Sequence, residues 1–202
     1  MTSTTPLITE ATLRDRDTIG DTIAEAFFPL DVIQHLVPDT GRRRPVSRAW
    51  YLQHIDHAIG GAGKVFMIDN RAAAVWFDRT GKVKVTEPED YAKRLAAATG
   101  PDLPRFRDLD TQMEALHPTD PQWHLLFLAV RRPWQGRGLG SRLLDHTHEW
   151  LDRNGYTAYL EATGDANEKL YQRHGYQLMT PPAIRLTPSL HLRRMWRPIQ
   201  TD

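Results

Sequence analysis

The chain has 202 residues, 40% of them hydrophobic, which is enough to bury one sizeable core and favours a single domain over 1–202. Its 26 Lys and Arg residues balance its 25 Asp and Glu residues, so we expect neither nucleic acid nor a membrane as a partner. The absence of cysteine excludes disulfides, thiolate zinc sites and cysteine nucleophiles. No apolar run is long enough for a membrane span, and residues 1–6 lack the apolar core of a signal peptide. We therefore expect a cytoplasmic protein.

The first half of the chain is expected to be mostly helical. A short strand at 7–13 begins it, and apolar runs at 64–68 and 72–77, joined by a polar turn, predict a β-hairpin. Segment 38–45 is predicted to be a turn-rich loop whose basic run, 42–44, is solvated. Helical spacing of apolar residues and flanking Pro or Gly predict helices at 15–28, 31–37, 46–59, 88–98 and 104–116.

The second half is expected to alternate strands and helices. The continuous apolar run 125–130 is typical of a strand buried on both faces, and 138–153 has one apolar side, as an amphipathic helix does. Further strands are predicted at 156–160, 176–179 and 190–196, with a short helix at 165–174. This mixture of elements predicts an α/β (α+β) fold.

A glycine-rich segment, QGRGLG at 135–140, lies between the buried strand and the strong helix. Alternate glycines let the backbone approach a ligand closely, and the helix that follows presents free N–H groups and the positive end of its dipole. Such a segment can cradle phosphates. The alternative is a turn that only joins strand to helix.

The glycine spacing leaves a second ligand open. The pattern from Gly136 nearly fits the dinucleotide motif G-x-G-x-x-G, except that Ser141 stands where the third glycine belongs. Glu161 follows about 20 residues later, where a ribose-binding acid is expected. The five-residue turn at 131–135, between strand and glycines, and the short remaining chain disfavour that fold.

Two motifs resemble those of the GNAT superfamily of N-acetyltransferases. Residues 135–140 are similar to its acetyl-CoA motif, [Q/R]-x-x-G-x-[G/A], and LYQRHGY at 170–176 is similar to its second signature. Asn167 stands where many members place an asparagine. Within the superfamily the chain is most similar to the puromycin N-acetyltransferases, through GKV at 63–65, AVW at 74–76, PQW at 121–123, QGRGLGS at 135–141 and LEAT at 160–163.

The resemblance implies a GNAT fold, with a mixed, mostly antiparallel, twisted sheet of about six or seven strands flanked by helices. It implies acetyl-CoA as co-substrate, no metal, and transfer of the acetyl group to the primary amine of a small molecule, such as an antibiotic-like amine. Substrate-facing parts are expected at 31–59 and 87–116, in a monomer or homodimer. A protein acetyltransferase and a non-catalytic acetyl-CoA-binding module are the alternatives.

The resemblance also implies roles for particular residues. The backbone of Phe127, Leu128, Ala129 and Val130 is expected to bind the pantetheine arm. Residues of the turn are expected to bind the pyrophosphate: Gln135, Gly136, Arg137, Gly138, Leu139, Gly140 and Ser141. Asn167 either bonds the cofactor arm or orients its own short helix.

Proton transfer is assigned in part by the resemblance. Tyr171 matches the tyrosine that protonates the leaving thiolate, against the alternative of an aromatic packing residue. Glu161 either acts as the general base or forms a structural ion pair, and His124 and His117 are weaker candidates. Trp50, Tyr51, Trp76 and Trp123 are candidates for an aromatic acceptor pocket, each more often a core residue.

Overall fold

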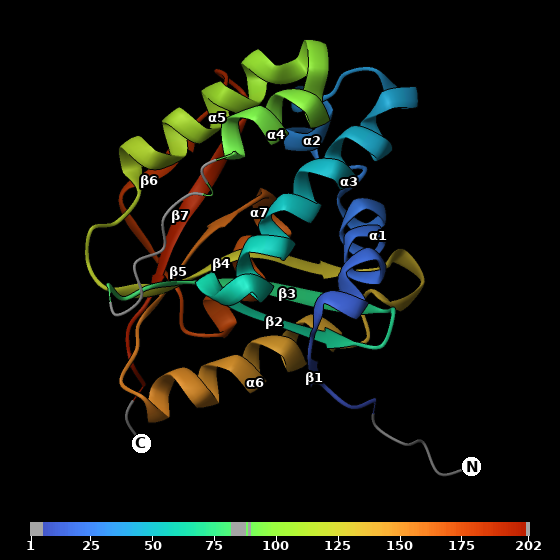
Figure 1. Ribbon diagram of the computed structural model, residues 1–202. Coiled ribbons are helices and arrows are strands. Elements are labelled where there is room, and N and C mark those ends of the chain that lie inside the picture. Colours follow the sequence, from blue (N-terminus) through green and yellow to red (C-terminus); the bar gives the residue numbers. More distant parts are fainter. Residues whose placement is uncertain (1–5, 82–87, 89, 201–202) are drawn as a thin grey trace.

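A computed structural model describes residues 6–81, 88 and 90–200, and these form a seven-stranded sheet flanked by helices (Figure 1). The strand order is β1-β2-β3-β4-β5-β7-β6. Neighbouring strands are antiparallel except β4 and β5, which are parallel. This order confirms the predicted mixed, mostly antiparallel sheet, and it differs from the mostly parallel sheet of a dinucleotide-binding fold.

The elements follow one another as a helical first half and an alternating second half. The strands are β1 (Thr9–Glu10), β2 (Gly63–Ile68), β3 (Ala72–Arg79), β4 (Gln122–Val130), β5 (Ala158–Ala162), β6 (Gln177–Arg185) and β7 (His191–Arg197). The α-helices are α1 (Arg16–Phe27), α2 (Asp31–Leu36), α3 (Thr40–His57), α4 (Tyr91–Thr99), α5 (Leu103–Leu116), α6 (Leu139–Arg153) and α7 (Gly164–Arg173). None of these helices is long and apolar enough to cross a bilayer.

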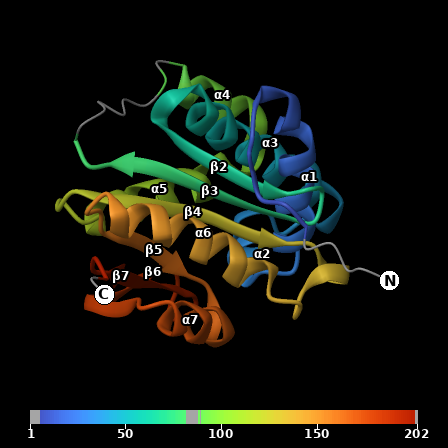
Figure 2. The same cartoon turned by 90° about the horizontal axis from the view of Figure 1, so that it is seen from below.

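Helices cover both faces of the sheet (Figures 1 and 2). Alternation along β2 shows how the sequence builds the two layers: Val65 and Met67 pack with α1–α5, whereas Phe66 and Ile68 pack with α6 and α7. Because both faces are buried, the strands are apolar without interruption. That is why 125–130 was recognisable as a central strand.

A β-bulge in β4 lies at the point where this strand begins to diverge from β5. Val75 and Trp76 of β3 pair with Phe127 and Leu125, so Leu126 is the extra residue. Before the bulge Leu125 packs with α6, and after it Phe127 packs on the opposite face. β4 pairs with β5 only from Trp123 to Leu125, so its remaining residues diverge from β5. The divergence leaves one backbone edge of β4 free of the β5 ladder.

The predicted loop at 38–45 is wrong, because α3 begins at Thr40. Asp39 caps it, its Oδ1 accepting from the backbone N–H groups of Gly41 and Arg42 at 2.8 and 3.1 Å. The basic run is only partly solvated: Arg44 is exposed, but Arg43 is not. Arg43 is buried and donates to the carbonyls of Val37 and Pro38, which follow α2. Prolines at both ends of the segment suggested a loop, but Pro45 is accommodated within the helix.

Other boundaries also differ from prediction. β1 covers only two residues of the predicted 7–13, and β6 runs to Arg185 instead of ending at 179. β6 contains Pro181 and Pro182, which an edge strand tolerates because one side of it donates no ladder hydrogen bonds. The predicted helix 88–98 begins at Tyr91, and residues 87 and 89 of the expected excursion lie outside the described part.

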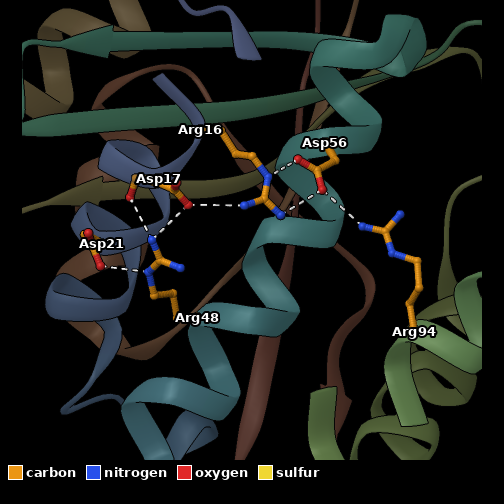
Figure 3. Close-up of polar contacts among 6 residues, drawn as sticks. All are labelled: Arg16, Asp17, Asp21, Arg48, Asp56 and Arg94. Atoms are coloured by element: carbon orange, nitrogen blue, oxygen red, sulfur yellow. Dashed lines mark hydrogen bonds and ion pairs between the residues drawn. The ribbon is translucent and has the colours of Figure 1, made fainter. Parts of the chain in front are cut away.

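A charge network joins α1, α3 and α4 (Figure 3). Asp56 of α3 accepts from Arg16 and from Arg94, the latter at 3.1 Å. On the same side, Arg48 donates to Asp17 and Asp21 at 3.0 and 2.8 Å. The network ties the first-half helices into one layer over the sheet.

Candidate active site

A cleft of about 570 Å³ lies where β4 diverges from β5, beside the glycine turn. Its walls come from four parts of the chain: the end of α1, the end of β4, the turn with the start of α6, and α7. Among the described residues, none that lines this glycine-turn cleft is acidic, and Arg173 supplies a positive charge. A cleft without carboxylates suits an anionic ligand.

The glycine turn presents backbone donors to this cleft. Gly136 and Gly138 have φ values of 71° and 76°, which only glycine adopts without strain. Gly138 is the N-cap of α6, and no side chain caps the helix, so its first N–H groups stay available to a ligand. Gln135 donates to the Val130 carbonyl at 2.8 Å and so fixes the turn against β4.

These features fit the diphosphate and arm of acetyl-CoA. The free N–H groups at the start of α6 would hold the phosphates, and the unpaired edge of β4 at Leu128–Val130 would bind the amide-bearing arm. Arg137 takes a different position, because its side chain stacks over Trp134 at 4.9 Å and does not line the cleft. Only its backbone can contribute to the expected cradle.

A small junction cavity of about 90 Å³ adjoins the glycine-turn cleft. Leu128, Asn167 and Tyr171 line both spaces. Burial raises the pKa of the Tyr171 phenol, so the hydroxyl stays protonated at neutral pH. Asn167 donates to the Thr163 carbonyl at 2.8 Å, which supports the helix-orienting role while leaving the residue at the cavity wall.

On the other side of the junction lies a larger helical chamber of about 760 Å³. It is bounded by α3, the end of β3, α4, α5 and the start of β4, and it shares Trp50, Met113 and Leu126 with the junction. Burial lowers the pKa of His54 to about 3 and that of His117 to about 4, so both line the chamber as neutral imidazoles. The chamber also contains Arg94, one end of the network in Figure 3.

A buried histidine–glutamate pair connects the two inner spaces. His124 Nε2 lies 2.7 Å from Glu161 Oε2, and each side chain is 5% exposed. His124 lines the chamber and Glu161 the junction. Burial by itself would raise the pKa of Glu161, but the attraction and hydrogen bond of His124 outweigh it and lower that pKa. The carboxylate is therefore ionised and accepts a hydrogen bond from His124 Nε2.

The structure brings most of the expected site residues to one series of cavities. The glycine-turn cleft is lined by Leu128, Ala129, Val130, Gln135, Gly136, Gly138, Leu139, Gly140, Ser141, Asn167 and Tyr171. Phe127 lines the junction. Of the aromatic candidates, Trp50 lines the chamber, while the other three are core residues away from it: Tyr51, Trp76 and Trp123.

Other lining residues were not anticipated. Phe27 and Leu30, around the end of α1, line both the cleft and the junction. Met113 of α5 lies at the boundary of junction and chamber. Each is one apolar residue among many on its helix, so no sequence signal marks it. Within the described residues, no group of three His, Cys, Asp or Glu side chains could hold a metal ion.

Residues 109–178 match the family profile described as an acetyltransferase (GNAT) domain. This segment holds the diverging strand, the glycine turn, α6, β5 and α7. Over these residues the chain is similar to GNAT acetyltransferase domains. The helices α1–α4, with the charge network, lie outside the matched residues.

Solved structures share this GNAT fold over nearly the whole chain. A Corynebacterium glutamicum protein, described as histone acetyltransferase HPA2 and related acetyltransferase, is 23% identical, with a TM-score of 0.73 and coverage of 98% of this chain and 99% of that one. Drosophila melanogaster polyamine N-acetyltransferase is 17% identical, with a TM-score of 0.62 and coverage of 94% and 97%. The ribosomal-protein-S18-alanine N-acetyltransferase of Escherichia coli is also 17% identical, with a TM-score of 0.55 and coverage of 97% and 95%.

Proposed function

We propose that this GNAT domain transfers the acetyl group of acetyl-CoA to the primary amine of a small molecule. The observation that carries the proposal is the series of three adjoining spaces. The junction shares lining residues with the glycine-turn cleft on one side and with the helical chamber on the other. A thioester entering from the cleft and an amine entering from the chamber would meet at the junction.

The residues at the junction suit the two proton transfers of this reaction. The amine must lose a proton, and the departing thiolate must gain one. We assign His124, which lines the chamber, as the group that accepts the amine proton at Nδ1, and Glu161 stabilises the imidazolium that results. Tyr171 stands on the cleft side, protonated, as a donor to the thiolate. In this proposal the Glu161–His124 pair, more than Glu161 alone, is the base.

The chamber favours a small acceptor over a protein. A protein acceptor needs an open groove along the surface, whereas residues of α3, α4 and α5 form walls of this chamber. A volume of about 760 Å³ lies within the range of small-molecule sites. Among small amines, we propose an antibiotic-like amine as the acceptor, which is supported by the resemblance of five short segments to puromycin N-acetyltransferases.

The test is the rate of thiol release from acetyl-CoA across a panel of acceptors. The panel contains aminonucleosides, aminoglycosides, arylalkylamines, polyamines and peptides with free N-terminal or lysine amines. We expect at least one small amine to be acetylated well above the rate of hydrolysis, and peptides to be poor acceptors. A preference for peptides would contradict the small-molecule assignment. Tight acetyl-CoA binding without transfer to any acceptor would favour a non-catalytic module.

A further inference from the structure

Three side chains outside the proposed proton-transfer residues form a hydrogen-bonded series beside the glycine-turn cleft. His174 Nε2 lies 3.1 Å from Ser141 Oγ, and His174 Nδ1 lies 3.1 Å from Asp145 Oδ1. Ser141 and Asp145 are one turn apart on α6, and His174 follows the last residue of α7. Ser141 lines the cleft, whereas His174 is not among its lining residues.

The protonation state of His174 decides what Ser141 can offer to a ligand. The Asp145 carboxylate only accepts, so Nδ1 carries a hydrogen in either state. In neutral His174, Nε2 is an acceptor and takes the serine hydroxyl hydrogen, leaving only oxygen lone pairs toward the cleft. In protonated His174, Nε2–H donates to Ser141 Oγ, and the hydroxyl hydrogen is free to turn toward the cleft.

A phosphate in the cleft distinguishes these two arrangements. Its oxygens accept hydrogen bonds and are negatively charged, so they are repelled by serine lone pairs and attracted by a serine hydroxyl hydrogen. Ser141 belongs to the first turn of α6, the turn whose free N–H groups face the expected diphosphate. We propose that His174 is a positioning residue for cofactor binding: its protonation, supported by Asp145, turns Ser141 into a donor to the diphosphate. This inference rests on the proposed acetyl-CoA site.

The other charged and titratable groups around His174 do not replace Asp145 in this role. Arg197 of β7 donates to the His174 backbone carbonyl at 3.1 Å, and its charge is paired with Asp152. The His148 ring of α6 lies 6.0 Å away, and burial lowers its pKa to about 3, so it is neutral. Tyr171 and Tyr176, next to His174 in sequence, have pKa values raised by burial and are also neutral. Arg173 is exposed and belongs to the cleft wall.

The experiment measures the affinity of 3′-dephospho-CoA by calorimetry between about pH 5.5 and about pH 8.5, the range in which histidine titrates. This probe keeps the diphosphate and lacks the phosphomonoester, which would itself titrate. We expect wild-type affinity to fall about tenfold as pH rises, the effect of losing one charge-assisted hydrogen bond. Binding near neutral pH should also take up protons, seen as a dependence of the binding heat on the buffer.

Two variants locate the effect. His174→Gln keeps an N–H donor for Ser141 but cannot titrate, so its affinity should stay high and lose the pH dependence. Ser141→Ala should bind at every pH with the low affinity that the wild type shows at high pH. Thermal melting confirms that each variant is folded.

The inference is contradicted if wild-type affinity does not depend on pH, or if His174→Gln or Ser141→Ala keeps the wild-type slope. Failure of the proposed function gives a different result. If neither CoA nor 3′-dephospho-CoA binds at any pH, the cleft is not a cofactor site, and both proposals fail. If binding is tight but flat with pH, only the role of His174 fails.

Discussion

The glycine-turn cleft and the helical chamber differ in how the chain builds them. The cleft is made largely by one continuous stretch from β4 to the start of α6, and its expected donors are backbone N–H groups. The chamber is made by side chains from α3, β3, α4, α5 and β4. A site formed by backbone needs only glycines and apolar residues at fixed spacing. A site formed by side chains depends on how distant elements pack.

The two spaces also differ in charge. The described residues that line the cleft include no acidic side chain, which suits a diphosphate. The chamber combines Arg79, Arg94, Asp110 and Glu114 with neutral His54 and His117. The cleft is therefore suited to one anionic ligand, whereas the chamber presents a mixed surface that can distinguish between acceptors. Substitutions on each side should affect different measurements.

On the cofactor side, a large effect is expected from Gly140→Asp. A Cβ at this position meets only Val130 and Leu128 at 3.7 and 3.8 Å, which is ordinary contact. Gly140→Ala should therefore bind acetyl-CoA within a few fold of wild type. Gly140→Asp adds a negative charge at the start of α6 and should weaken binding by about 100-fold or more. Calorimetry measures the acetyl-CoA affinity of the two folded variants. Equal affinities would contradict the assignment of the glycine turn as the phosphate-binding site.

At the junction, Tyr171→Phe should lower turnover by about 10²–10⁴-fold while leaving acetyl-CoA affinity near wild type. The ring and its packing stay, and only the hydroxyl is lost. Tyr176→Phe is the matched control, because Tyr176 is also buried, its ring lies 5.7 Å from that of Tyr171, and it does not line the cleft or the junction. Steady-state kinetics that show equal turnover for Tyr171→Phe and wild type would exclude the acid role.

Glu161→Gln tests the proposed base. Removing the carboxylate withdraws stabilisation from protonated His124, so the acid limb of the pH–rate profile should move to lower pH and the plateau should fall by about 10²-fold. Glu114→Gln is the control, since Glu114 lines the chamber but is exposed and apart from the pair. It should alter the acceptor KM without moving the limb. A profile of unchanged shape, with only reduced stability, would make Glu161 a structural partner.

The residues expected on the cofactor side lie together in the structure more completely than those expected on the acceptor side, and the reason is physical. The glycine turn, Asn167 and Tyr171 lie within one local strand–helix–strand–helix segment, where spacing along the chain determines proximity. The pairing of His124 with Glu161 depends on the parallel register of β4 and β5, which aligns Leu125 with Leu160. Nothing local to either residue reveals that register. Arg43 was predicted to be exposed because a run of basic residues is usually solvated. Its partners are the carbonyls of Val37 and Pro38, which become available only after α2 and α3 fold.

The neutral histidines of the chamber should make the protein less stable in acid. Burial holds the pKa of His54 near 3 in the folded state, whereas an unfolded histidine titrates near 6.5. Below about pH 6.5 the unfolded state binds a proton that folded His54 excludes, so stability is lost as pH falls toward about 3. His54→Gln should lower the loss between about pH 7 and about pH 5 by about 1–2 kcal/mol. Urea unfolding at both pH values measures this, and an identical loss in both proteins would contradict it.

The smallest expected effect comes from the charge network at α4. Asp56→Asn weakens two partly exposed ion pairs, with Arg16 and Arg94, and should cost about 0.5–1 kcal/mol. Because Arg94 lines the chamber, the acceptor KM should change while acetyl-CoA affinity stays constant. Asp21→Asn, in the part of the network remote from α4, is the control. A change in cofactor affinity in Asp56→Asn would show that the two sides are not separate.

The central claim is that cleft and chamber meet at the junction, and a conjugate that joins CoA sulfur to an accepted amine through a two-carbon acyl linker tests it directly. Calorimetry should show the conjugate binding about 10²-fold or more tighter than CoA alone, because one ligand then occupies both spaces. The gain should shrink in Met113→Trp, which adds bulk where junction and chamber adjoin, while CoA affinity is unchanged. A conjugate that binds no more tightly than CoA, in a protein that acetylates the free amine, would contradict the claim.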